Sequence, residues 1–220
     1  MRRLASMTTA FLSLALLSGL GSAPAAQVLP DDADRGQPEL FEGSGRFSWQ
    51  RPDYIGRMVG FREGDKVVEL GAGRGFYSKL LIHTVFDTGR VYALESDPDA
   101  VEYLKSEEIP NTWGNFFPML FDGQKIEIPD AEIDIVISIN YWHRLQRSQE
   151  VASEVERVLK PGGRLVIIDW HDGEVEIAPA RDKRLNRERL LREMEAAGWL
   201  LTSESHALKY QYFFIFTKKA

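Results

Sequence analysis

The sequence has no cysteine, no apolar run long enough to cross a membrane, and no excess of basic residues. Without cysteine the chain has no disulfide framework, no thiolate metal site and no thiol nucleophile. Its N-terminal apolar run, Ala10–Leu20, has 11 residues, whereas a membrane-spanning helix needs about 20. The net charge is −6. Because contacts to phosphates need a basic face, we expect no nucleic-acid partner.

The first 26 residues have the pattern of an export signal. The basic pair Arg2-Arg3 precedes the apolar run Ala10–Leu20, and the small residues of Ala23-x-Ala25 follow as a signal peptidase site. We therefore predict a cleavable signal peptide over residues 1–26, a periplasmic or secreted protein, and no stable membrane insertion after cleavage. The alternatives are an uncleaved N-terminal anchor and a wrongly chosen start codon.

Cleavage would leave 25 basic and 33 acidic residues, a net charge of −8, because residues 1–26 contain two arginines and no acidic residue. The remaining length suits one well-cored domain. Residues 27–50 are rich in Asp, Gly and Pro and show no sustained period, which predicts an N-terminal arm or linker. We assign residues 51–220 to the folded domain.

Short apolar segments alternate with helical periodicity from Asp65 onward. Near-continuous apolarity is typical of strands buried on both faces of a parallel sheet. The predicted strands are Val67–Leu70, Arg90–Leu94, Phe116–Phe121, Ile133–Ile139 and Arg164–Ile168. The predicted helices are a short one after Pro52 that ends before Gly60, then Phe76–Val85, Asp99–Glu107, Ser148–Leu159 and Arg187–Ala197. This alternation predicts a doubly wound α/β fold.

The C-terminal segment departs from this alternation. The predicted strands Leu200–Ser205 and Gln211–Thr217 are separated by only five residues. A parallel pair needs a crossover of a dozen or more residues, so these strands must form an antiparallel hairpin. The predicted fold is a mostly parallel seven-stranded sheet that ends in this hairpin.

A glycine-rich turn joins the first predicted strand to the helix that follows it. Glycines let a ligand approach the main chain closely, and this turn lies at the carboxyl edge of the sheet. The dinucleotide fingerprint G-x-G-x-x-G, aligned from Gly71, would need glycine where Phe76 stands. No G-K-[ST] follows, which excludes a P-loop. Phe76 and the terminal hairpin also argue against an NAD-dependent oxidoreductase.

The observed pattern, Glu-x-Gly-x-Gly-x-Gly from Glu69 to Gly75, resembles motif I of class I (Rossmann-like) S-adenosylmethionine-dependent methyltransferases. The resemblance covers about residues 51–220 and implies methyl transfer with S-adenosylmethionine as cofactor. The cofactor-binding residues that it implies in this turn are Glu69, Gly71, Ala72, Gly73 and Gly75. The alternative is a glycine turn that serves only tight packing.

Other segments agree with this resemblance. Glu95 ends the second predicted strand and matches the acid that holds the ribose hydroxyls, since a carboxylate accepts from both. Asp122 matches an acid beside the adenine amino group, although an ordinary turn aspartate is an equal reading. Asn140 begins the loop over the methyl-donor end. The run Leu159–Gly163 (LKPGG) matches a structural signature of the family.

Two Trp-His pairs follow neighbouring predicted strands, Trp142-His143 and Trp170-His171. If the strand order is the usual one of the family, both pairs line one mouth, where His143 or His171 is a candidate general base and the tryptophans shape a pocket. The alternative is that both histidines are surface loop residues. A metal site built from these histidines with Asp169 and Asp172 matches no defensible ligand spacing, so we predict no metal.

Together these features predict an exported S-adenosylmethionine-dependent methyltransferase. Its acceptor is a small molecule or an envelope component. The alternative is a catalytically inactive module of the same fold that binds S-adenosylmethionine or a nucleoside. The intact glycine turn and Glu95 favour the enzyme.

Overall fold

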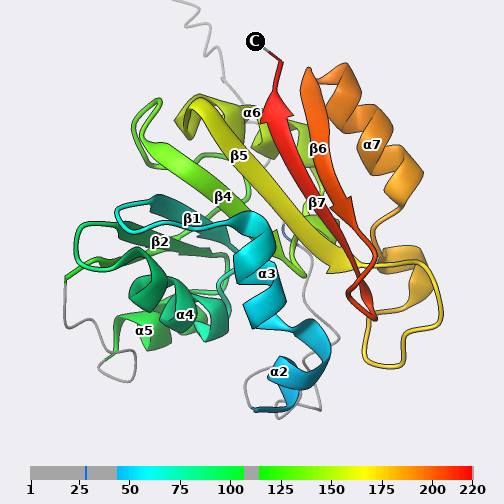
Figure 1. Cartoon of the computed structure of the whole chain (residues 1–220), viewed down its shortest axis with the longest axis horizontal. Coiled ribbons are helices and arrows are strands. Elements are labelled where there is room, and N and C mark those ends of the chain that lie inside the picture. The colour runs from blue at the N-terminus through cyan, green and yellow to red at the C-terminus, as the bar shows by residue number, and fades with distance from the viewer. Residues whose placement is uncertain (1–27, 29–43, 107–113, 220) are drawn as a thin grey trace, which may run out of the picture.

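The computed structural model describes residue 28 and residues 44–106 and 114–219. A seven-stranded sheet runs through this part of the chain (Figure 1). The predicted signal peptide lies outside the described residues, as does the predicted arm except for residues 28 and 44–50. The strands are β1 (Lys66–Leu70), β2 (Arg90–Glu95), β3 (Phe116–Leu120), β4 (Ile133–Ile139), β5 (Leu159–Trp170), β6 (Trp199–Ser205) and β7 (Gln211–Lys218).

The strand order β3-β2-β1-β4-β5-β7-β6 confirms the predicted fold class. Strands β1 to β5 pair in parallel, and β7 runs antiparallel to both β5 and β6. The chain moves outward from β1 to β3 and then returns to the other side of β1 as β4. The carboxyl ends of β1 and β4 therefore flank the switch point, which is where open α/β sheets bind their ligands.

Strand β5 is longer than predicted because it includes the Leu159–Gly163 segment. Ile133 of β4 pairs with Leu159, and the next pair joins Ile135 to Arg164, so the register shifts there. The Pro-Gly-Gly residues are thus accommodated as an irregularity inside the ladder rather than as a turn before it.

The helices agree with the predicted ones to within about two residues, with one addition. The predicted end of one helix, Glu107, lies outside the described residues. The observed helices are α2 (Ser44–Gln50), α3 (Pro52–Val59), α4 (Phe76–Val85), α5 (Pro98–Lys105), α6 (Ser148–Val158) and α7 (Arg187–Ala196), with short 3₁₀ turns η1 (Trp142–Arg144) and η2 (Arg181–Lys183). The addition is α2, which was not predicted because seven residues are too few to show a helical period.

Local sequence explains where the helices begin. The Asp97 side chain accepts a hydrogen bond from the Asp99 N–H at 3.0 Å and caps α5, and Pro98 occupies its first turn. The Asn186 side chain caps α7 by accepting from the Arg189 N–H at 2.8 Å. No helix of the described residues combines the length and the apolarity that a membrane span requires.

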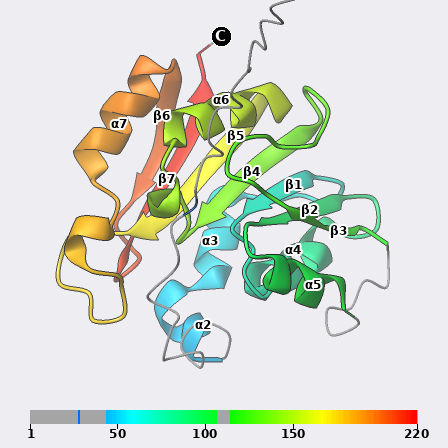
Figure 2. The ribbon, with the colours of Figure 1, turned by 180° about the vertical axis from the view of Figure 1, so that it is seen from behind.

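The sheet separates two apolar cores. One core joins even-numbered side chains of β1 and β4, such as Val68 and Val136, to α6 and α7. The other joins their odd-numbered side chains, such as Val67 and Ile135, to α3, α4 and α5. Figure 1 shows α3 in front of the sheet, and Figure 2, from behind, shows α6 on the opposite face.

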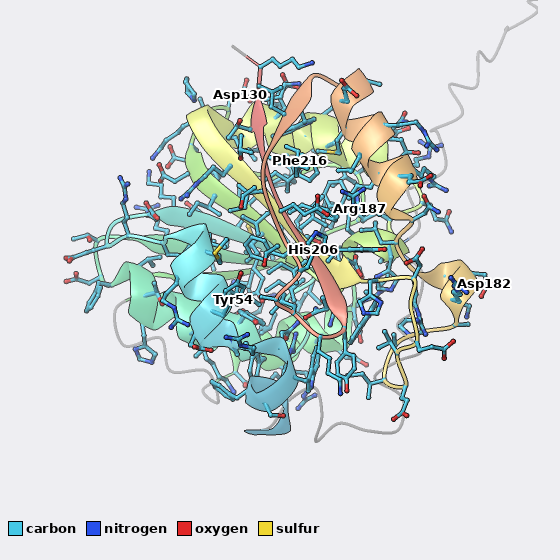
Figure 3. All side chains as sticks on the ribbon, turned by 45° about the vertical axis from the view of Figure 1, so that its right-hand side comes forward. Tyr54, Asp130, Asp182, Arg187, His206 and Phe216 are labelled. Atoms are coloured by element: carbon cyan, nitrogen blue, oxygen red, sulfur yellow. The ribbon has the colours of Figure 1, made fainter. Side chains whose placement is uncertain are left out.

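Helix α3 is attached to the sheet at both ends. Near its start, the Tyr54 hydroxyl lies 2.6 Å from the Ser205 hydroxyl at the end of β6. At its end, the Arg164 guanidinium of β5 donates to the Val59 carbonyl at 2.6 Å. Figure 3 shows Tyr54 on this helix, while Asp182 of η2 lies at the periphery. Helix α3 therefore fixes the position of α2, which precedes it directly.

Candidate active site

The turn between β1 and α4 is built from glycines in left-handed backbone conformations. The φ angles of Gly71, Gly73 and Gly75 are 77°, 54° and 80°. Residues with a side chain rarely adopt these angles. The Gly71 N–H donates to the Leu94 carbonyl of β2 at 2.8 Å, and the Ala72 N–H donates to the same oxygen at 3.1 Å. The turn is therefore held against the end of the neighbouring strand.

Two glycines of this turn differ in what surrounds them. A Cβ on Gly71 would overlap the ring of Tyr141, so Gly71 is required by packing within the protein. A Cβ on Gly73 would meet no atom within 4 Å. Gly73 therefore borders open space at the carboxyl edge of the sheet, which is where a ligand can lie against the main chain.

Glu69, the predicted acid of the turn, is buried at the end of β1 with a fractional exposure of 3%. The Ser78 hydroxyl of α4 donates to its carboxylate at 2.5 Å. Burial raises the pKa of Glu69 to about 8, although the Ser78 hydrogen bond and the charge of Arg46 act in the opposite direction. A cation bound beside this carboxyl would favour its ionised form.

Glu95 lies at the end of β2 and is connected directly to the glycine turn. Its Oε2 accepts from the Gly73 N–H at 2.8 Å. Its Oε1 accepts from the N–H groups of Ser96, at 2.6 Å, and Asp97, at 3.1 Å, and from the Ser96 hydroxyl at 3.1 Å. The carboxylate is thus pre-positioned at the turn, and rotation of the Ser96 hydroxyl would release acceptor capacity for a ligand.

Asp122 follows β3 and is exposed. Its Oδ1 accepts from the N–H groups of Gln124, at 2.8 Å, and Lys125, at 3.1 Å. The preceding residue, Phe121, donates its N–H to the Glu95 carbonyl at 2.8 Å. The structure therefore places Asp122 at the same edge as Glu95, and its observed contacts are those of a turn aspartate.

Asn140 directly follows β4 and is buried, with φ of 55°. Its N–H donates to the Ile168 carbonyl of β5 at 2.8 Å. Its side-chain oxygen accepts from Gln211, the first residue of β7, at 2.6 Å. Gln211 was not among the predicted site residues. The available signal was a polar residue at the start of the otherwise apolar QYFFIFT run.

The two candidate bases have different surroundings. His143 Nδ1 lies 2.7 Å from Asp169 Oδ1, and the His143 N–H donates to Asp169 Oδ2 at 2.9 Å. The side chains of His143 and Asp169 are 5% and 0% exposed, so this histidine is not a surface loop residue. Asp169 was considered in the sequence only as a metal ligand, and its pairing with His143 depends on the register of β4 against β5.

His171 is held by the main chain of its own loop and of the β6–β7 turn. Its Nδ1 accepts from the Gly173 N–H at 3.0 Å, and its Nε2 lies 3.0 Å from the Lys209 carbonyl. This arrangement places the proton on Nε2 and uses both ring nitrogens. The structure therefore does not bring His171 together with His143 as a second base.

The two tryptophans of these pairs belong to different parts of the molecule. Trp142 is buried in the core that contains α6 and α7. Trp170 is fully buried, and its ring stacks on Trp49 of α2 with centroids 5.4 Å apart. Trp170 therefore packs against α2, and the two tryptophans do not line one pocket as predicted.

Helix α2 also reaches the glycine turn. The Arg46 guanidinium lies 4.5 Å from the Phe76 ring centroid and 5.3 Å from that of Tyr77, both in the first turn of α4. Arg46 also bonds to the Gln50 side-chain oxygen. Figure 1 shows α2 beyond the carboxyl ends of the central strands. Within the described residues, no three His, Asp or Glu side chains converge as a metal site.

Known proteins resemble this chain over the segment that carries most of these residues. Residues 68–167 match a family model described as a methyltransferase domain. This part of the chain is a methyltransferase domain. The matched segment begins in β1 and ends in β5, and so contains the glycine turn, Glu95, Asp122, Asn140 and His143.

Solved structures and curated relatives agree with this domain assignment. A methyltransferase of Aquifex aeolicus, described as SAM-dependent, superposes with a TM-score of 0.78 at 24% identity, over 85% of this chain and 98% of that one. The fold is therefore that of class I S-adenosylmethionine-dependent methyltransferases.

A Pseudomonas fluorescens ubiquinone/menaquinone C-methyltransferase is 25% identical over 60% of this chain and 51% of its own. A Methylococcus capsulatus malonyl-[acyl-carrier protein] O-methyltransferase is 30% identical over 53% and 40%, respectively. The chain spans about half the length of these curated relatives.

The methyltransferase domain has room and chemistry for the cofactor of this fold. A Cβ on Gly73 would meet no atom within 4 Å, so the main chain is open to a ligand there. Glu95 offers a carboxylate to hydroxyl groups, and the buried Glu69 is a counter-charge for a cationic group. The residues present therefore fit S-adenosylmethionine.

Proposed function

We propose that the chain is an S-adenosylmethionine-dependent methyltransferase that acts on a small-molecule or envelope acceptor. The observation that carries the proposal is the open position beside Gly73, which is tied through its N–H to Glu95 and lies at the switch point of the sheet. Glu69, Gly73 and Glu95 would hold the cofactor, and the predicted contribution of Asp122 is to the adenine end.

The bound cofactor supplies a methyl group on a sulfonium. When bound, it would supply this methyl group to an electron pair of the acceptor, and its sulfur would keep the electron pair of the carbon–sulfur bond. The protein contributes mainly by aligning the two reactants, which is worth up to roughly 7–11 kcal/mol in favourable cases. An oxygen or nitrogen acceptor must also lose its proton.

His143 is the proposed recipient of that proton. The Asp169 carboxylate, 2.7 Å from Nδ1, holds the proton of the neutral ring on Nδ1 and so places the ring lone pair on Nε2. The same carboxylate stabilises the imidazolium that forms when Nε2 takes the proton. Asp169 thus acts as a positioning residue for His143. Between the two predicted bases, these contacts favour His143 over His171.

The relatives do not select one acceptor. One is named as a C-methyltransferase of quinone biosynthesis and another as an O-methyltransferase of an acyl-carrier protein. We therefore propose the acceptor only as a small molecule or an envelope component. A carbon acceptor also releases a proton, from the C–H bond that the methyl group replaces, so the proposed role of His143 applies to both chemistries.

Binding is tested by calorimetry of the full chain with S-adenosylhomocysteine. We expect micromolar affinity, lost in Gly73→Ala because the methyl group fills the space beside the turn. Gly162→Ala is the matched control, since Gly162 also has a left-handed φ, 79°, and an open Cβ position, but lies at the other edge of the sheet. No heat with well-folded wild type, or equal loss in both variants, would reject the proposal.

Turnover is tested by incubating the full chain with a labelled methyl donor and candidate acceptors. Label transfer identifies an enzyme, and His143→Ala should reduce it for oxygen and nitrogen acceptors without changing cofactor affinity. Tight cofactor binding with no transfer to any acceptor would instead support the inactive binding module.

We also propose that the protein is exported, on the basis of the N-terminal pattern alone. Expressed in a bacterial host, the chain should be recovered from the periplasm with a new N-terminus close to Ala26. Recovery of the full-length chain from the cytoplasmic fraction alone would reject export and would leave the methyltransferase proposal unaffected.

A further inference from the structure

Two buried side-chain amides at the carboxyl edge of the sheet share a single hydrogen bond. Asn140 and Gln211 have exposures of 7% and 2%, and the Gln211 amide nitrogen donates to the Asn140 oxygen at 2.6 Å. Asn140 Nδ2 and Gln211 Oε1 have no hydrogen-bond partner among the described residues, and both atoms are inaccessible to solvent. Buried polar atoms are nearly always paired, so a donor and an acceptor left together need an explanation.

The orientation of the amides does not change this result. If both side chains were rotated by 180°, Asn140 would donate to Gln211, and the atoms left over would be the Asn140 oxygen and the Gln211 nitrogen. If only one were rotated, two like atoms would face each other. Every favourable arrangement leaves one donor and one acceptor side by side.

The amide pair lies between the glycine turn and an aromatic wall formed by Trp49 and Trp170. Tyr141, the residue after Asn140, packs its ring against Gly71 of the cofactor turn. On the other side, Gln211 is paired in the β5–β7 ladder with Trp170, which stacks on Trp49. Directly opposite residues of an antiparallel pair project to the same face of a sheet. The amide pair therefore lies at the same edge of the sheet as the glycine turn.

Helix α2 contains a further buried amide that is not fully paired among the described residues. Gln50, next to Trp49, is completely buried, and its Nε2 has no hydrogen-bond partner in the described part of the chain. Next to the stacked Trp49 and Trp170 rings, the Asn140–Gln211 pair supplies polar groups that carry no charge.

We propose that the Asn140–Gln211 pair recognises a neutral hydroxyl or carboxamide group on an aromatic methyl acceptor, an inference that rests on the proposed function. A hydroxyl donates to Gln211 Oε1 and accepts from Asn140 Nδ2 through one oxygen, and a carboxamide does so through its two ends. A carboxylate would satisfy only the donor and would place its negative charge against the Gln211 oxygen. The pair therefore selects against carboxylates.

The test uses the full chain saturated with S-adenosylhomocysteine and four probes of similar size: phenol, benzamide, benzoate and toluene. Binding is followed by ligand-observed NMR. We expect phenol and benzamide to bind at least tenfold more tightly than benzoate and toluene. Gln211→Met should remove this preference and leave S-adenosylhomocysteine affinity within twofold. Gln149→Met is the matched control, because Gln149 is an exposed glutamine on α6.

A gain of binding guards against a variant that merely folds poorly. Gln211→Glu puts a negative charge at the same place, and we expect benzamidine, the cationic analogue of benzamide, to bind at least tenfold more tightly than to wild type. The inference is overturned if neither phenol nor benzamide binds, if benzoate binds as well as benzamide, or if neither Gln211 variant changes probe selectivity. Absence of S-adenosylhomocysteine binding would instead refute the proposed function.

Discussion

Replacing Glu69 by glutamine should make the unliganded protein more stable at alkaline pH. Burial raises the pKa of this carboxyl to about 8, from 4.5 for a solvated glutamate. Between these values the folded chain keeps a proton that the unfolded chain has lost, so the free energy of unfolding falls as pH rises. The contribution of the protonated Glu69 carboxyl to the free energy of unfolding is fully present below about pH 4.5 and is lost as pH rises through about 8.

The magnitude follows from the size of the pKa change. Each pKa unit corresponds to about 1.4 kcal/mol, so a change from 4.5 to about 8 gives an upper limit of about 5 kcal/mol. Glutamine carries no titrating proton and keeps an oxygen that accepts from the Ser78 hydroxyl. The stability of Glu69→Gln relative to wild type should therefore rise between pH 5 and pH 9 by several kcal/mol.

The assay is guanidinium chloride unfolding of both proteins without ligand, followed by circular dichroism at pH 5, 7 and 9. Glu63→Gln, at an exposed position, is the control for loss of a carboxylate. A stability difference between wild type and Glu69→Gln that does not change with pH would refute a buried protonated carboxyl. Calorimetry at pH 7 in buffers of different ionisation enthalpy provides a second readout. A cationic ligand beside Glu69 should release up to one proton from wild type and none from Glu69→Gln.

Three further changes test other parts of the structure. Gly71→Ala should lower the free energy of unfolding by about 2–4 kcal/mol in chemical denaturation, because its methyl group overlaps Tyr141 and φ is 77°. Asp169→Asn should reduce turnover of an oxygen or nitrogen acceptor by about 100-fold or more, and move the acidic limb of the pH–rate profile to lower pH, because His143 loses the carboxylate that orients it and stabilises its imidazolium. Arg157→Leu should cost about 2–3 kcal/mol in thermal or chemical unfolding, because its guanidinium bonds two main-chain carbonyls and the Asp130 carboxylate between β3 and β4, and the Glu154 carboxylate of its own helix.

Local patterns were sufficient to predict most of the fold. The strands are short apolar runs bounded by polar residues, and the five-residue gap before Gln211 permits only a hairpin. Helix α2 was missed because its seven residues are stabilised by distant contacts, such as the stacking of Trp49 on Trp170, rather than by a repeating pattern. The extension of β5 was missed for a related reason. Its Pro-Gly-Gly segment has turn composition, and only pairing with β4 keeps it in the ladder.

The candidate site was predictable where one segment carries it and not where two distant segments meet. The turn from Glu69 to Gly75 is a single run of residues, so its pattern was visible in the sequence. The pairing of Asn140 with Gln211 joins positions 71 residues apart. Their hydrogen bond depends on β7 inserting next to β5. The general prediction of a hairpin did not specify this register.

The two Trp-His pairs show how the same dipeptide acquires different chemistry. Each lies at the carboxyl end of a parallel strand, so sequence alone made His143 and His171 equivalent candidates. In β5 the alternation of side chains sends Asp169 toward one face of the sheet, where it meets His143 at 2.7 Å. His171 instead enters a loop whose own N–H and carbonyl groups use both its ring nitrogens. A neighbouring carboxylate that fixes the tautomer and stabilises the charged ring suits a histidine to act as a base. The register of two strands, not the local sequence, therefore decides which histidine is the candidate base.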